Sequence, residues 1–182
     1  TSREKLVDGT AIAVATLSGS LAAPHIKTLW NLDDLEMNFK DILHKKKGIK
    51  GVLEADLNIK EGQRLFFNQL KLTLPPLVLS GKGSLDPQGN GLRKLSIKLY
   101  PLTLSSLPKG LTLLGSTLTR GSIKFSLNVQ GKSKDWRQWN KKGWIALTKG
   151  EFGVEGLSNP LSNISLLLNL ERHAVELSLI HI

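Results

Sequence analysis

Strict alternation of apolar and polar residues runs through most of this 182-residue chain and constrains its fold more than any other feature. From Ile49 to Lys60 the odd positions carry Ile, Leu, Ala or Gly, and most even positions carry charged or amide side chains. Successive side chains of a strand point to opposite faces, so this period predicts a strand with one wet face and one apolar face. The same period predicts strands over 66–74, 77–85, 94–99, 122–130, 145–147, 164–170 and 175–179, after an opening strand over 10–21.

Turn residues separate these segments and indicate how they connect. Asp, Pro, Asn and Gly cluster at 86–91, Asn and Gly occur at 140–143, Gly ends the polar segment 60–62, and Pro75-Pro76 lies between two predicted strands. Such short connections favour antiparallel hairpins. The predicted fold is therefore mainly β, an antiparallel meander forming a curled, twisted sheet that is an open groove or an incomplete barrel, with one or two short helices. The helical candidates are 105–114 and 133–139, whereas 32–43 fits either a helix or a strand and is assigned to strand.

The apolar faces of these strands need a cover, and few segments have the helical period to provide one. A meander in this state either closes on itself as a sandwich or barrel, or curls into a trough whose apolar interior holds an apolar ligand. The alternation is the same in both cases. The sequence pattern therefore leaves the closed core and the open groove as alternatives.

The ends of the chain and a weak internal similarity bear on domain organisation. The chain begins with Thr1 and ends in an apolar alternation over 177–182, so we expect one β module, 1–182, that is a fragment of a longer protein. The segment 17–21 followed by Pro24 resembles the segment 79–85 followed by Pro87. This pair predicts an internal repeat of about sixty residues, the length of a unit of several strands.

Composition limits the chemistry and suggests a charged partner. The chain has no Cys, which excludes disulfides, thiolate metal sites and Cys nucleophiles. Its net charge of +10 suggests an anionic partner, either nucleic acid or the headgroups of acidic lipids. Nucleic acid is the less favoured partner, because aromatic residues are only 5% of the chain and do not interleave with the basic runs. The run Lys45, Lys46 and Lys47 is either a solvated hairpin tip or a contact for phosphate or headgroups.

The usual catalytic and metal-binding patterns are missing from the sequence. The four histidines, His25, His44, His173 and His181, are scattered along the chain, and no nucleophile elbow, phosphate loop or dinucleotide fingerprint occurs. The candidate glycines Gly83, Gly89 and Gly91 lie in or beside a predicted turn, where backbone conformation explains them. We therefore expect no enzyme activity, no metal and no cofactor.

Several short motifs resemble one family in their order along the chain. They are Leu17-Ser18-Gly19-Ser20-Leu21 before Pro24, the connector 102–108, the strand 121–131 ending in Gly, Asp135-Trp136, 143–147 and 156–164 with its Asn159-Pro160-Leu161 core. In this order they resemble the AsmA-like superfamily of Gram-negative bacteria, which includes AsmA, TamB and YhdP.

The resemblance implies a lipid-binding or lipid-conducting β groove in a periplasmic protein that a helix absent from this chain anchors to the inner membrane. That family is linked to phospholipid transport to the outer membrane and to envelope integrity, and the alternative that it implies is a non-enzymatic scaffold for a protein partner in outer-membrane protein assembly. Headgroups or other anions would meet Lys45, Lys46 and Lys47. The acyl chains would contact Leu53, Leu57, Ile59, Leu70, Leu72, Leu74, Leu95, Ile97, Leu99, Ile123, Phe125, Leu127, Val129, Leu166 and Leu168.

Overall fold

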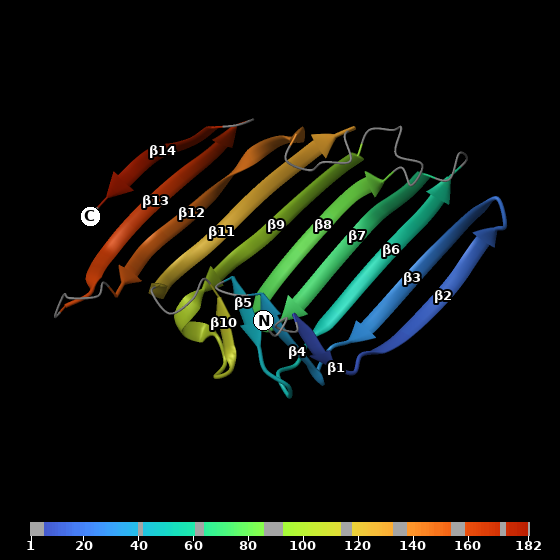
Figure 1. Ribbon diagram of the computed structural model, residues 1–182, viewed down its shortest axis with the longest axis horizontal. Coiled ribbons are helices and arrows are strands. Elements are labelled where there is room, and N and C mark those ends of the chain that lie inside the picture. Colours follow the sequence, from blue (N-terminus) through green and yellow to red (C-terminus); the bar gives the residue numbers. More distant parts are fainter. Residues whose placement is uncertain are drawn as a thin grey trace, which may run out of the picture.

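The computed structural model describes residues 6–39, 42–60, 64–85, 93–113, 118–132, 138–153, 159–171 and 174–181, with the backbone alone for 174–181 and Thr119. These residues form two antiparallel sheets, and the larger one is the meander that the alternation predicts (Figure 1). The larger sheet has ten strands and the smaller has four. The two outer strands of the larger sheet, β2 and β14, do not pair with each other, so this sheet is not closed into a barrel.

The ten-stranded sheet is a meander in which neighbours in space are mostly neighbours in sequence. Its order is β14-β13-β12-β11-β9-β8-β7-β6-β3-β2, and Figure 1 shows it as one broad layer of long strands. Its strands are β2 (Ile12–Ser20), β3 (Ala23–Asn31), β6 (Val52–Lys60), β7 (Arg64–Leu74), β8 (Leu77–Leu85), β9 (Arg93–Thr103), β11 (Leu118–Gly131), β12 (Asn140–Phe152), β13 (Leu161–Glu171) and β14 (Ala174–His181).

The four-stranded sheet combines a short strand that precedes β2 with excursions out of this meander. Its order is β1-β4-β5-β10, with β1 (Val7–Gly9), β4 (Leu35–Phe39), β5 (Leu43–Lys45) and β10 (Leu111–Leu113). The chain leaves the large sheet after β3 to form β4 and β5, and leaves it again after β9 to form the 3-10 turn η1 (Leu104–Ser106) and β10. In Figure 1 this small sheet lies at the lower ends of the central long strands.

Most predicted elements are confirmed, with differences at the excursions. Within the ambiguous segment 32–43, Leu35–Phe39 form strand β4, and one turn of 3-10 helix falls at the start of the segment 105–114. The second helical candidate, 133–139, lies mostly outside the described residues. The alternation did not single out β3 as a separate strand, and it did not predict a second sheet.

The buried core lies where the small sheet packs on one end of the large one. The core residues are apolar side chains from one end of β7, β8, β9, β11 and β12, together with those of the elements that cover this end. Burial of these side chains stabilises the fold by about 1.5–3 kcal/mol each relative to leaving them exposed. The core residues are Leu32, Met37, Leu74, Leu77, Leu99, Leu102, Leu104, Leu111, Leu118, Ile123 and Leu147.

A buried lysine joins the small sheet to the turn that follows β3. Lys45 is fully buried, and its Nζ donates hydrogen bonds to the carbonyls of Leu35 (2.7 Å), Asp33 (3.2 Å) and Lys46 (3.3 Å). The Asp33 carboxylate in turn accepts the backbone N–H of Gly51 at 2.8 Å, just before β6. Burial lowers the pKa of Lys45, and the nearby carboxylates of Asp33 and Asp34 partly oppose that shift.

Candidate functional site

The apolar side chains of the large sheet line up in rows that cross the strands. Cross-strand pairs connect each row from β6 to β9 and on to β11, so that successive side chains stand beside one another on one face. A first row, nearest the small sheet, is Leu53, Leu72, Leu79, Leu99, Phe125, Ile145 and Leu168. A second row is Ala55, Leu70, Gly81, Ile97, Leu127, Gly143 and Leu170, and a third row is Leu57, Phe67, Gly83, Leu95 and Val129.

The small sheet covers part of this apolar face, so a ligand cannot reach that part. Leu74, Leu99 and Ile123, three of the predicted lining residues, are only 0%, 5% and 6% exposed because they belong to the core. They are structural residues in this fold. Four more predicted residues are half-buried and pack against that core: Leu53, Leu72, Phe125 and Leu166.

The remaining predicted residues lie farther from the small sheet. They are half-buried by their neighbours on the sheet and do not belong to the core cluster. We call the second and third rows, with Ile59 beside them, the open region. The predicted residues in it are Leu57, Ile59, Leu70, Leu95, Ile97, Leu127 and Val129, and Leu168 lies at its border in the first row.

Two glycines leave a strip of β8 without side chains in the middle of the open region. Gly81 and Gly83 point to the apolar face between Leu70 and Phe67 on β7 and Ile97 and Leu95 on β9. The strip separates two strand backbones that lie about 10 Å apart, twice the spacing of neighbouring strands. Gly83 lies inside β8, as the strand predicted over 77–85 requires, so the adjacent predicted turn does not explain its glycine; Gly89 and Gly91 lie outside the described residues.

The two glycines differ in what a side chain would meet. A Cβ at Gly83 would collide with the carbonyl oxygen of Lys94, so the close approach of β8 and β9 requires glycine there. A Cβ at Gly81 would lie 3.5 Å from the carbonyl oxygen of Ser96, an ordinary contact. The backbone thus does not require glycine at Gly81, and its absent side chain leaves open surface between β7 and β9.

The basic run predicted to meet headgroups or other anions is divided by the fold. Lys45 is fully buried and bonded to three carbonyls, so it cannot contact a headgroup in this structure. Lys46 and Lys47 are exposed, and Lys47 Nζ lies 3.5 Å from Asp8 Oδ2. The charge of Lys45 favours a solvent-exposed hairpin tip. Its strand partners, however, are the buried residues Met37 and Leu111.

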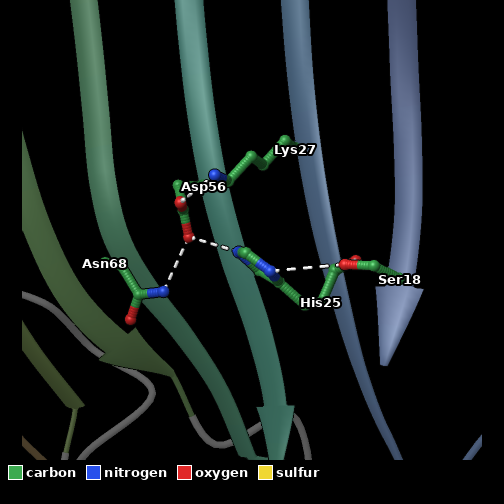
Figure 2. Close-up of polar contacts among 5 residues, drawn as sticks. All are labelled: Ser18, His25, Lys27, Asp56 and Asn68. Carbon is green, nitrogen blue, oxygen red and sulfur yellow. Dashed lines mark hydrogen bonds and ion pairs between the residues drawn. The ribbon is translucent and has the colours of Figure 1, made fainter. Parts of the chain in front are cut away.

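A polar cluster crosses four strands on the opposite face of the large sheet (Figure 2). His25 Nε2 lies 2.9 Å from Asp56 Oδ1, which also accepts a hydrogen bond of 2.6 Å from Asn68 Nδ2. Lys27 Nζ lies 3.9 Å from Asp56 Oδ2, and Ser18 Oγ lies 3.5 Å from His25 Nδ1. The hydrogen bond from Asn68, followed by that with His25, holds the pKa of Asp56 below its usual range.

This cluster has the residue types of a Ser-His-Asp triad but does not have its geometry. The distance from Ser18 to His25 is long for a hydrogen bond between a nucleophile and its base. Acyl transfer also needs N–H donors aimed at a developing oxyanion, and the backbones of β2 and β3 pair with each other beside Ser18 and His25. The arrangement suits a cross-strand network that ties β2, β3, β6 and β7 together.

The described residues supply neither a metal-binding group nor a membrane-spanning helix. Among them, no three His, Asp or Glu side chains gather as ligands would. His25 and His44 each meet one carboxylate, Asp56 and Glu36 respectively. Within the same part of the chain, no helix has the length and apolarity needed to cross a bilayer.

Comparisons with known proteins identify no relative. No family model matches the chain, and neither a curated protein nor a solved structure matches it. The resemblance to AsmA-like proteins consequently stays a prediction from short motifs, and the function is inferred from the surfaces of the molecule.

Proposed function

We propose that the open region binds the acyl chains of lipids. The observation that carries the proposal is the division of one apolar face into a covered end and a long half-exposed remainder that runs across the strands from β6 to β13. Contiguous apolar surface of this kind on a folded protein usually marks an interaction site. Each methylene group of an acyl chain that leaves water there gains about 0.8 kcal/mol.

The shape of the open region favours a chain-like ligand. The strip over Gly81 and Gly83 lies between two ridges, Leu70 with Phe67 and Ile97 with Leu95. A linear apolar chain lying on this strip would touch both ridges, while a polar headgroup stays in water at an end of the sheet. The mechanism is passive binding or sliding and needs no cofactor.

The resemblance to AsmA-like proteins supports a cellular setting for this activity. We propose that the chain is the groove module of a periplasmic protein anchored in the inner membrane of a Gram-negative bacterium. In that setting the module supports phospholipid transport to the outer membrane.

The first experiment is native mass spectrometry of the chain after expression in a Gram-negative periplasm. Mass additions that match phospholipids and disappear on denaturation are expected, and extraction identifies the lipid. Leu127→Asp should abolish the additions, because it places a charge in the second row. Asn128→Asp is the matched control, since it adds the same charge to the opposite face of the same strand. A lipid-free wild type, or equal loss in both variants, contradicts the proposal.

A second candidate function is strand addition by a protein partner at β2, in the manner of an assembly scaffold. This edge strand contains no charged residue, and Ile12, Val14 and Leu17 are 67%, 64% and 70% exposed. Edge strands of soluble proteins usually carry charges, Pro or bulges that prevent pairing, whereas β-augmentation uses an unprotected edge. Val14→Lys with Thr16→Pro should abolish capture of one specific protein from envelope extract and leave lipid binding intact. Unchanged capture by this variant argues against the edge as the site.

A further inference from the structure

The central strands of the large sheet carry an excess of positive charge on the face opposite the open region. β8, β9 and β11 contain six basic residues and not one acidic residue. Lys82, Lys94, Lys98 and Lys124 lie on this face, whereas Arg93 alternates onto the face of Leu95 and Arg120 follows a break in register. These strands lie side by side in the middle of the sheet (Figure 1). The excess is therefore concentrated in one area.

Strand register gathers four lysines around one small polar centre. Ser96 on β9 pairs with Lys82 on β8 and with Asn128 on β11, and Asn128 pairs with Lys142 on β12. Lys94 and Lys98 lie two residues to either side of Ser96, on the same face. We call Lys82, Lys94, Lys98 and Lys142 the lysine diamond. The backbone positions of Lys94 and Lys98 are four residues apart along β9, and those of Lys82 and Lys142 are three strand spacings apart across the sheet. Each of these distances is about 13–14 Å.

The surface inside the lysine diamond is hollowed, and the hydroxyl of Ser96 and the carboxamide of Asn128 lie on its floor. A hollow of about 450 Å³ is lined by Lys82, Lys94, Ser96, Asn128 and Lys142, among others, and a second of about 300 Å³ by Ser80, Ser96 and Lys98, among others. Ser96 and Lys82 belong to both hollows. Hydroxyl and carboxamide groups on this floor can donate hydrogen bonds to anionic oxygens.

The positive charge of the lysine diamond is only slightly compensated by the described residues. Lys142 Nζ lies 3.5 Å from Glu171 Oε1, but both side chains are largely exposed, so this pair is weak. No carboxylate within the described part of the chain forms an ion pair with Lys82, Lys94 or Lys98. Like charges at this spacing repel one another at low ionic strength, where screening is weak.

We propose that the lysine diamond binds a soluble oligoanion that carries several phosphate or sulfate groups. Such a ligand can enter the two hollows and place separate anionic groups near different lysines, which a single phosphate cannot do. The headgroup plane of a bilayer would meet only the tips of these lysines. This site is independent of the proposed acyl-chain site, because it lies on the other face of the sheet.

The test uses inositol hexakisphosphate as the probe and calorimetric titration at low and moderate salt. The wild type should bind it far more tightly than inorganic phosphate, and the affinity should fall as salt rises. Lys82→Gln with Lys98→Gln should weaken binding at least tenfold and flatten the salt dependence. The matched control, Lys50→Gln with Lys109→Gln, removes the same net charge from exposed lysines outside the diamond and should weaken binding less than threefold.

Two further measurements separate the sources of the anion and locate the site. Sedimentation with vesicles of anionic or of zwitterionic phospholipid tests the membrane. Acetylation with mass-spectrometric readout should show protection of Lys82, Lys94 and Lys98 by the probe, with little protection of Lys50 and Lys109. The proposal is overturned by absence of probe binding at low salt, by equal loss in the two double variants, by uniform protection of all lysines, or by binding to anionic vesicles alone.

Discussion

The two ends of the apolar face share one sequence pattern and differ in what lies on them. Leu99 and Leu95 are four residues apart on β9 and point to the same face, yet Leu99 is 5% exposed and Leu95 remains half-buried. Only the first lies under the small sheet. Burial of an alternating strand is thus decided by the excursions β4–β5 and η1–β10, and the alternation itself carries no information about it.

This comparison separates a stability region from a binding region within one sheet. At the covered end, apolar side chains fill a closed core and are needed for folding. In the open region the same residue types are still wetted, so they contribute less to stability and are available to a ligand. The same kind of substitution should therefore mainly lower stability at the covered end and mainly lower ligand binding in the open region.

The largest expected effect comes from placing a charge at each end. Leu102→Asp should cost several kcal/mol, enough to abolish the cooperative unfolding transition, because Leu102 is 1% exposed and the new carboxylate has no partner. Leu127→Asp should cost about 1 kcal/mol, since its carboxylate remains hydrated. Urea denaturation followed by circular dichroism measures both. Similar losses in the two variants would mean that the open region is a closed core in solution.

The next effect tests the hydrogen bonds of Lys45 that join the small sheet to the turn after β3. Lys45→Met should lower the free energy of unfolding by about 2–4 kcal/mol, because it leaves the carbonyls of Asp33, Leu35 and Lys46 without their shared donor. Lys46→Met, at the exposed neighbour, should change it by no more than about 0.5 kcal/mol. Hydrogen exchange should show faster opening of β4 and β5 in the first variant only. Unaltered exchange of β4 and β5 in Lys45→Met would mean that these hydrogen bonds do not hold the small sheet in place.

The same lysine predicts a pH dependence with a definite sign. Burial lowers the pKa of Lys45 in the native state, so between that pKa and about 10.4 the unfolded state binds more protons. The stability contribution of Lys45 should therefore rise with pH across this interval. Lys45→Met should lack the rise, and a parallel pH profile in the two proteins would contradict the assignment.

The sequence predicted the large sheet well because its signal is local. Alternation, a diproline turn and short Gly- and Asn-rich connections are visible within each hairpin, and nine of the ten long strands follow from them. The small sheet was missed because β1, β5 and β10 have three residues each, too few to show a period. Lys45 was misplaced for a related reason, since its Nζ bonds to the carbonyls of Asp33 and Leu35, twelve and ten residues away.

The surfaces were less predictable than the strands. The polar cluster joins Ser18 and His25 to Asp56 and Asn68 from other hairpins, and the lysine diamond takes its members from β8, β9 and β12. Strand register creates both, and register depends on bulges, such as that between Phe67 and Leu70, that leave no clear mark in the sequence. The predicted internal repeat remains a prediction.

A smaller effect distinguishes the two glycines of β8. Gly83→Ala should destabilise the protein by about 1–3 kcal/mol, because the new methyl group forces β8 away from β9. Gly81→Ala should stabilise it by up to about 1 kcal/mol, since the backbone tolerates a side chain and glycine weakens a strand. Thermal denaturation measures the difference between them.

The same strip also connects stability to binding. Gly81→Val should leave the fold intact and fill the gap between β7 and β9, so it should reduce binding of a fluorescent acyl probe. A Gly81→Val protein that binds the probe like the wild type would exclude the strip as the path of the acyl chain and leave the stability comparison of the two glycines standing.

The smallest expected effect lies on the opposite face, in the polar cluster of Figure 2. The pKa of Asp56 is lowered first by Asn68 and then by His25, so between the native pKa and about 3.9 the unfolded state binds more protons. The stabilising contribution of Asp56 is therefore complete above about pH 4 and is lost as the pH falls through the native value. An NMR titration of the carboxyl carbon should place its midpoint below the ordinary Asp range. Asn68→Ala should raise that midpoint more than His25→Ala does, whereas equal midpoints in all three proteins would mean that the cluster does not persist in solution.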